Sequence, residues 1–201
     1  MKLYSNPASP FARKCRIIIQ ELEIRCEIVD VDARNDETLR RINPLKKIPA
    51  LVLDDGSVLF DSPVICEYLN HIGGGKLYPG MSILRGSAGR WKSLGLQALG
   101  DGIMDAAVAT RYQVIQPPED QNAAFIARYA ADIGGGLDAL ERVTFQDPPT
   151  IGEISVACAL GYLDFRFADL GWRAGHPKLA AWYETFSTKY PSMKDTAPPR
   201  A

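Results

Sequence analysis

Residues 47–69 read KIPALVLDDGSVLFDSPVICEYL, and this stretch decides the fold of the N-terminal part of the chain. Two apolar runs, at 49–53 and 57–60, flank an Asp-Asp-Gly turn. Asp-Gly between two apolar runs is a strong signal for a β-hairpin, so we expect two antiparallel strands here. Residues 62–72 follow with apolar side chains on one helical face and end at a run of glycines, which predicts a helix.

The residues before this stretch predict a βαβ unit. Residues 2–5 are typical of a short strand, residues 10–22 repeat apolar side chains at helical spacing, and residues 26–32 alternate as a second strand. Because a helix connects these two strands, they are expected to be parallel. With a further short helix at 35–42, residues 1–76 are expected to form an α/β domain of order βαβαββα around a mixed four-stranded sheet.

No strand pattern returns in the rest of the chain. We expect a linker at 77–81 and then an all-helical domain at 82–201. Helices are expected near 83–114, 120–142, 150–169 and 176–188. Thr150 and Glu153 have the spacing of a capping box, which favours a helix start there. The last six residues, TAPPRA, are expected to be loose.

Composition and charge exclude several classes of function. The formal net charge is -1, which gives no electrostatic reason to expect a nucleic acid or a membrane surface as partner. The longest apolar-rich run, ISVACALGYL, is too short to span a bilayer. The two histidines and four cysteines lack metal-ligand spacing, so we expect no metal. The cysteines have apolar neighbours and no paired spacing, which favours buried thiols and a cytoplasmic location.

Three short polar elements in the N-terminal domain are candidates for chemistry. Ser9-Pro10 stands at the predicted start of the first helix, Ile48-Pro49 precedes a strand, and Asp61-Ser62-Pro63 precedes the second helix. Serine is a favoured N-cap and proline a favoured first helical residue, so a purely structural interpretation applies to both Ser-Pro pairs. Taken alone, each element supports only that interpretation.

Together the three elements resemble the thioredoxin-like domain of the glutathione S-transferase family. The resemblance rests on SPFARK at 9–14, KIPAL at 47–51 and DSPVICEYL at 61–69, in this order around the predicted hairpin. It also covers the helical domain, so it extends over essentially the whole chain. It implies a bacterial, serine-type glutathione transferase that joins the glutathione thiolate to a small hydrophobic electrophile, as in detoxification.

The resemblance implies a catalytic role for Ser9. The glutathione thiolate is the nucleophile, but a thiol with a pKa of about 8.5 is mostly protonated at neutral pH. The free N–H groups and the dipole of a helix N-terminus stabilise an anion. A serine hydroxyl both accepts and donates, so Ser9 is expected to cap the helix and to donate to the thiolate. Ser5 is a lesser rival for this role.

The same resemblance assigns the other groups of glutathione. Ser62 is expected at the γ-glutamyl carboxylate, Asp61 at the ammonium, and the backbone of Ile48 at the cysteinyl backbone. Lys47 is expected at the glycine carboxylate, with a solvated surface lysine as the alternative. Phe11 and Pro49 complete the expected glutathione site. Arg13, Lys14 and Arg34 are weaker candidates for the glycine carboxylate.

Two alternatives stay open on sequence grounds. The resemblance implies a homodimer with glutathione as co-substrate. The alternative is a binding or interaction protein that kept the fold of the family and lost the activity. Failure to bind glutathione would identify this alternative. A glutathione-dependent isomerase is disfavoured, because such relatives carry a segment richer in serine and cysteine than SNPASPF at 5–11.

Overall fold

The computed structural model of the protein describes residues 1–80 and 88–199, in two compact units. The first unit comprises the chain up to Arg90 together with the C-terminal segment from Pro191; the second runs from Trp91 to Tyr190. The expected linker end at residue 81 and the expected helical residues 83–87 lie outside the described part. Within that part, no helix is long and apolar enough to cross a membrane. The domain ranges 1–76 and 82–201 stay a prediction.

The first unit is built on the expected mixed sheet of four strands. The strands are β1 (Lys2–Ser5), β2 (Glu27–Asp30), β3 (Ala50–Val52) and β4 (Val58–Leu59), in the spatial order β2-β1-β3-β4. Strands β1 and β2 are parallel, whereas β3 is antiparallel to both β1 and β4. The predicted βαβ unit and the predicted hairpin are therefore confirmed.

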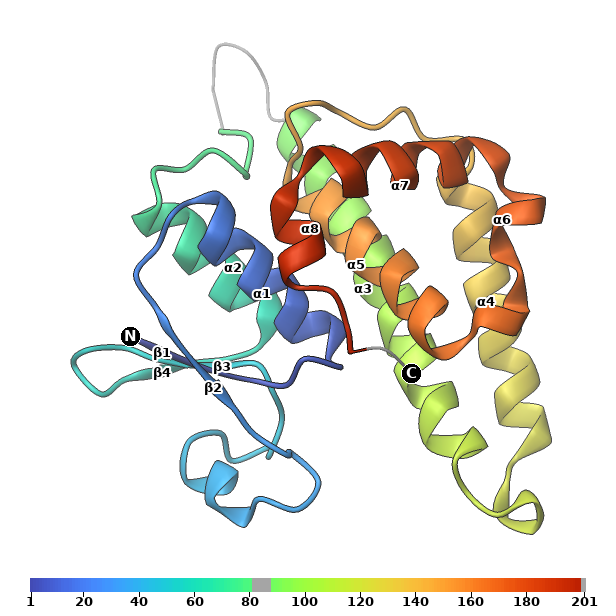
Figure 1. Ribbon diagram of the computed structural model, residues 1–201, viewed down its shortest axis with the longest axis horizontal. Helices are drawn as coiled ribbons and strands as arrows, with labels where there is room; N and C mark the ends of the chain where they lie inside the picture. The colour runs from blue at the N-terminus through green and yellow to red at the C-terminus, as the bar shows by residue number, and fades with distance from the viewer. Residues whose placement is uncertain (81–87, 200–201) are drawn as a thin grey trace. The chain divides into compact units, whose positions relative to one another are not determined.

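Two helices pack together against this sheet, as Figure 1 shows. Helix α1 (Pro10–Glu21) buries Ile17 and Ile18, and helix α2 (Ser62–Ile72) buries Ile65 and Leu69. Cys15 of α1 meets Cys66 of α2 in this core, with 3.7 Å between the two sulfur atoms. None of the four cysteines forms a disulfide. Helical periodicity therefore predicted most of the buried positions of the two helices, but Ile72, on the predicted apolar face of α2, is 43% exposed.

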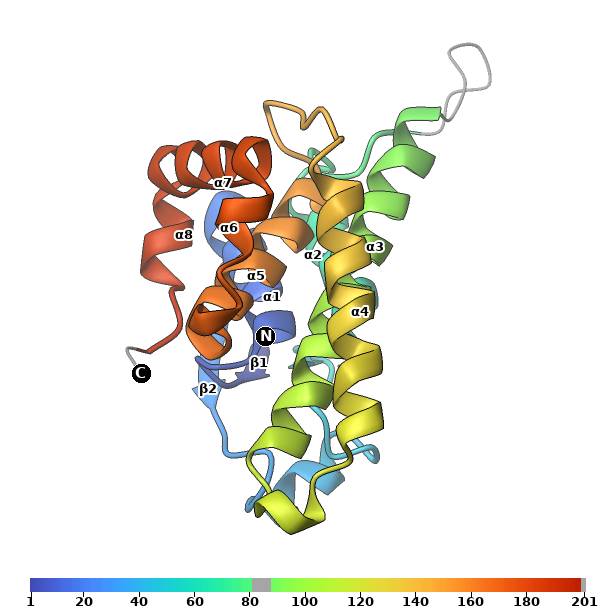
Figure 2. The ribbon, with the colours of Figure 1, turned by 90° about the vertical axis from the view of Figure 1, so that its right-hand side faces the viewer.

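The second unit is helical throughout its regular elements. Its main helices are α3 (Ala88–Val114, of which the part from Trp91 belongs to this unit), α4 (Ala123–Leu140), α5 (Ile151–Arg166) and α7 (Pro177–Lys189), with a short α6 (Trp172–Gly175). Figure 2 shows α3 and α4 side by side. Gly136 of α4 lies against Ile103 of α3, where an added Cβ would come within 2.8 Å of the Ile103 side chain. Helix α5 is buried along nearly its whole length.

The predicted capping box at the start of α5 is present. The Gly152 N–H donates to Thr150 Oγ1 at 3.2 Å, and the Thr150 N–H donates to Glu153 Oε2 at 2.9 Å. Glu153 also accepts from the Gln146 N–H at 3.0 Å. This buried carboxylate therefore ties the preceding loop to the first turn of α5.

The structure differs from the expected helices mainly at their ends. The expected short helix at 35–42 is a 3₁₀ turn, η1 (Glu37–Arg41), and further 3₁₀ turns η2 (Pro118–Asp120) and η3 (Ala168–Leu170) replace the predicted ends near 120 and 169. A short α8 (Pro191–Asp195) precedes the tail. The expectation of a loose tail is wrong at its first residue, because Thr196 is buried and hydrogen-bonded within the first unit.

Candidate functional site

The strand register brings the three polar elements of the sequence to one end of the sheet. Tyr4 of β1 is opposite Ala50 of β3, and Leu51 of β3 is opposite Leu59 of β4, both in antiparallel pairs. The end of β1, the start of β3 and the end of β4 therefore lie at the same edge. The Ser9 loop follows β1, Ile48-Pro49 precedes β3, and Asp61-Ser62 follows β4 at that edge.

Ser9 stands at the N-terminus of α1, as predicted. Its Oγ accepts a hydrogen bond from the Ala12 N–H at 3.2 Å, and Pro10 is the first helical residue. The preceding turn is held by Asn6, whose side chain accepts from the Ala8 N–H at 2.9 Å and donates to the Val31 carbonyl at 3.1 Å. Because the cap uses the Ser9 oxygen as acceptor, the hydroxyl hydrogen remains able to donate to a ligand.

Asn43 organises the turn that leads into Ile48-Pro49. Its amide donates to the Lys47 carbonyl at 2.8 Å, and its Oδ1 accepts from the Leu45 N–H at 3.0 Å. Asn43 is buried, and the peptide bond between Ile48 and Pro49 is cis. The functional assignment from sequence did not include Asn43, although Asn-Pro at 43–44 is a recognised turn signal.

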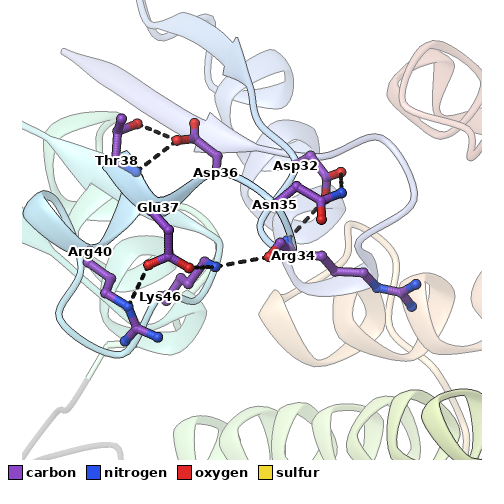
Figure 3. A network of polar contacts seen from close by, with 8 residues as sticks. All are labelled: Asp32, Arg34, Asn35, Asp36, Glu37, Thr38, Arg40 and Lys46. Atoms are coloured by element: carbon purple, nitrogen blue, oxygen red, sulfur yellow. Dashed lines mark hydrogen bonds and ion pairs between the residues drawn. The ribbon is translucent and has the colours of Figure 1, made fainter.

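Charged and polar side chains between residues 32 and 46 form a network of hydrogen bonds and ion pairs in the segment before Ile48-Pro49, as Figure 3 shows. Lys46 Nζ donates to the Arg34 carbonyl at 2.9 Å and pairs with the Glu37 carboxylate, which also accepts from Arg40 at 2.9 Å. Hydrogen bonds from Lys46 and then Arg40 lower the pKa of Glu37. Nearby, the Arg34 N–H and then the Asn35 side chain lower the pKa of Asp32. Lys46 is thus engaged in the loop, whereas the neighbouring Lys47 is exposed.

The start of α2 presents Asp61 and Ser62 at the same edge of the sheet. Asp61, not Ser62, occupies the N-cap position, and its exposed side chain makes no capping hydrogen bond. Ser62 is the first helical residue and is buried. The interpretation of Ser62 as a simple cap is therefore wrong by one position. Since the first N–H groups of a helix have no partner within the helix, this start is suited to an anion.

The other predicted residues fall into two groups. Phe11, in the first turn of α1, and Ile48 are half-buried, and Pro49 is buried, all in the segments that meet at this edge. Arg13 and Lys14 are buried instead, and Arg13 donates to the Met193 carbonyl at 2.8 Å, so the structure gives Arg13 a different partner from the expected carboxylate. Ser5 is also fully buried, whereas Ser9 is half-buried.

This edge of the first unit combines two helix N-termini, a strand start and several hydroxyl, carboxylate and ammonium side chains. Such an arrangement suits a ligand with both anionic and cationic groups. Among residues 1–80 and 88–199, no cluster of three or more His, Cys, Asp or Glu side chains is placed to hold a metal ion. The sheet order, the cis-proline and the two packed helices define a thioredoxin-like domain, which a helical unit follows.

Comparison with known proteins identifies the family. Residues 8–72 match the glutathione S-transferase N-terminal domain and residues 123–185 the C-terminal domain. YibF, an uncharacterized GST-like protein of Escherichia coli K12, is 33% identical over 207 residues, with both chains covered to 100%. A glutathione transferase family member from Pseudomonas fluorescens Pf-5, crystallised with bound glutathione, is 42% identical, with a TM-score of 0.89 and 98% of each chain covered.

A second crystal structure from the same organism contains S-(propanoic acid)-glutathione. It is 41% identical to this chain, has a TM-score of 0.84, and covers 99% of this chain and 100% of its own. The protein described here belongs to the glutathione S-transferase family.

Proposed function

We propose that this protein is a glutathione transferase that binds glutathione in its first unit and transfers the thiolate sulfur to a small hydrophobic electrophile. The observation that carries the proposal is the strand register, which gathers the Ser9 loop, Ile48-Pro49 and Asp61-Ser62 at one edge of the sheet. The relatives crystallised with glutathione support glutathione as the ligand. Glutathione is the co-substrate, and the proposal includes no metal.

In this proposal Ser9 stabilises the thiolate. Its hydroxyl donates to the sulfur while its oxygen keeps the cap on α1, and the helix N-terminus adds a favourable dipole. Both interactions favour the anion, so they lower the pKa of the bound thiol and increase the fraction of nucleophile at neutral pH. The proton of the thiol leaves to solvent.

The remaining groups of glutathione have matching partners at the same edge. Ser62 and the first N–H groups of α2 suit the γ-glutamyl carboxylate, and the exposed Asp61 suits its ammonium. The backbone of Ile48, beside Pro49, suits the cysteinyl backbone, as an added strand would. Lys47 is assigned to the glycine carboxylate, and Phe11 to the wall beside the thiol.

The chemical step forms one carbon–sulfur bond. A lone pair of the thiolate attacks an electrophilic carbon, and either a leaving group departs with its electron pair or water protonates the resulting carbanion. The glutathione bound to the Pseudomonas fluorescens relative carries a propanoic acid group on its sulfur, which supports this type of product. We further propose a homodimer, a cytoplasmic location and a role in detoxification, on the family resemblance and, for the location, on the absence of disulfides.

Replacement of Ser9 tests the catalytic assignment. Ser9→Ala is expected to lower kcat by about 10²-fold, the usual effect of removing one donor to a developing or resident anion. Glutathione affinity should stay nearly unchanged, because the other contacts remain. Isothermal titration with glutathione and turnover of a chloronitrobenzene electrophile provide the two measurements. Unchanged kcat in the variant would overturn the role of Ser9.

Two further variants separate catalysis from helix capping. Ser9→Asp retains an acceptor for the cap but has no hydroxyl donor, so it should lose turnover like Ser9→Ala. Asn122 caps α4 through the Phe125 N–H at 3.0 Å, and Asn122→Ala loses a comparable cap outside the first unit. That control should lower stability by about 1 kcal/mol and leave kcat intact. A wild-type protein that does not bind millimolar glutathione would favour the non-catalytic interaction protein instead.

A further inference from the structure

The C-terminal segment lies against α1, the helix that begins at Ser9. Helix α8 contacts α1, next to which Figure 1 shows it, and both belong to the same compact unit. Met193 and Thr196 are 2% and 1% exposed, so this end of the chain is part of the interior of the first unit. The contact is remote in sequence, because about 180 residues separate the two segments.

Arg13 fixes the C-terminal segment in one position. Its guanidinium donates to the Met193 carbonyl at 2.8 Å and to Thr196 Oγ1 at 3.4 Å. The Thr196 hydroxyl in turn donates to the Ser192 carbonyl at 2.6 Å, which closes the last turn of this segment. Each of these bonds is buried, so water does not compete for the donors and acceptors.

Arg16 connects the same segment to the Ser9 loop. It lies three residues after Arg13, hence on the same side of α1. One nitrogen of its guanidinium donates to the Thr196 carbonyl at 3.4 Å and to the Pro7 carbonyl at 3.2 Å. Pro7 is two residues before Ser9, in the turn that Asn6 closes from the other side. The guanidinium therefore bridges the C-terminal segment and the loop that carries the proposed thiolate donor.

We propose that Arg16 is a positioning residue for Ser9, and that the C-terminal segment at 192–196 is the anchor that holds Arg16 in place. The proposal rests on the proposed function of Ser9. A hydroxyl donor stabilises an anion only within a narrow range of distance and angle. A rigid, planar guanidinium with two backbone acceptors limits the motion of the Pro7 carbonyl, and with it the placement of the Ser9 hydroxyl.

Arg16→Met tests the bridge, because methionine retains an apolar stem and removes every donor. The first readout is hydrogen exchange at the Ala8 and Ser9 amides, which donate to Asn6 in the native loop. Exchange at these two amides should accelerate roughly tenfold, the fold-change that a hydrogen bond with a charged partner supports. The amides of the β3–β4 hairpin should be unchanged. Arg25→Met, at an exposed arginine, is the matched control and should leave both regions unchanged.

The second readout is the thiolate itself. The ultraviolet absorbance of bound glutathione, followed against pH, should show a higher thiol pKa in Arg16→Met than in the wild type. The kcat at neutral pH should fall roughly tenfold while the KM for glutathione stays within about twofold, because the loop holds the sulfur and the rest of the site holds the peptide. Arg16→Lys retains a charged donor and should recover part of the loss.

Variants of Thr196 keep the test decisive if Arg16→Met does not fold. Thr196→Val keeps the shape of the side chain and removes the hydroxyl that joins Arg13 to Ser192. The anchor of Arg16, which binds the Thr196 carbonyl, is then looser, so exchange at Ala8 and Ser9 should accelerate. Thr196→Ser retains the hydroxyl and should not accelerate exchange. Equal exchange at these amides in the wild type, in Arg16→Met and in Thr196→Val would overturn the inference, provided that the variants fold. The exchange measurement needs no glutathione. A wild type that fails to bind glutathione would therefore refute the proposed function without obscuring this result.

Discussion

Ser9 and Ser62 are both serines followed by proline, yet the structure gives them different positions. Ser9 is the N-cap of α1 and its Oγ accepts from the backbone, whereas Ser62 lies one residue inside α2, after the exposed Asp61. Because Ser62 is not the cap residue, its replacement tests ligand binding with little effect on the helix itself. The two residues thus allow separate tests of the thiolate and the carboxylate ends of glutathione.

Ser62→Ala is expected to weaken glutathione binding roughly tenfold, since it removes one hydrogen bond to a charged acceptor. Unlike Ser9→Ala, it should leave the pKa of bound thiol unchanged at saturating glutathione. Isothermal titration and the pH dependence of thiolate absorbance measure the two quantities. Ser57→Ala, in the exposed hairpin turn, is the control and should bind as the wild type does. Equal affinity in Ser62→Ala would refute the assignment of Ser62.

At the scale of elements, α3 and α5 approach each other closely through glycine. A Cβ added to Gly100 would lie 2.8 Å from the Ser155 carbonyl carbon and 2.9 Å from the Val156 nitrogen. These are backbone atoms of α5, which cannot rotate away as a flexible side chain does. A Cβ added to Gly102, on the same helix, would have no atom within 4 Å among the described residues, apart from its chain neighbours and the nearby backbone of α3 itself.

The two glycines therefore predict opposite effects of the same substitution. Gly102→Ala should stabilise the protein by about 1 kcal/mol, through the better helix propensity of alanine. Gly100→Ala should destabilise it by about 1–3 kcal/mol, the usual cost of overpacking, because the added methyl group would clash with the backbone of α5. Urea unfolding followed by circular dichroism measures both. A Gly100→Ala protein as stable as Gly102→Ala would contradict the close helix contact.

At the scale of the whole molecule, stability should fall in acid. Lys189 and then Tyr190 lower the pKa of Asp147, Ser57 lowers that of Asp55, and Lys46 lowers that of Glu37. A carboxyl group whose folded pKa is below its unfolded value contributes stability above the unfolded pKa and loses it as pH falls through the folded pKa. The thermal midpoint should therefore decrease from about pH 4 downward.

A combined Glu37→Gln and Asp147→Asn variant sharpens this prediction. It removes from each unit one carboxyl group whose pKa is lowered in the folded state. Its thermal midpoint should therefore depend less on pH below about 4 than that of the wild type. Differential scanning calorimetry at several pH values provides the measurement. Parallel pH profiles for the two proteins would show that these contacts contribute nothing to acid sensitivity.

Local sequence patterns were sufficient for the strands and the long helices, but not for the 3₁₀ turn η1 or the exact helix ends. Apolar spacing predicted α1 and α2, Asp55-Gly56 predicted the hairpin, and the Thr150–Glu153 pair predicted the start of α5. Each of these features depends on side chains within a few residues of one another. The family resemblance followed from the order of three such patterns, and the matched domains and relatives confirm it.

Long-range contacts decided what local patterns do not contain. The backbone hydrogen bonds of the sheet bring the end of β1, the start of β3 and the end of β4 to one edge of the sheet. Only this register places the segments that carry Ser9, Pro49 and Ser62 together. Arg13 and Arg16 look like surface residues in a basic segment, because charged side chains are rarely buried. The folded chain instead buries Arg13 and half-buries Arg16, and the Met193 and Thr196 carbonyls of the C-terminal segment accept hydrogen bonds from the two guanidinium groups.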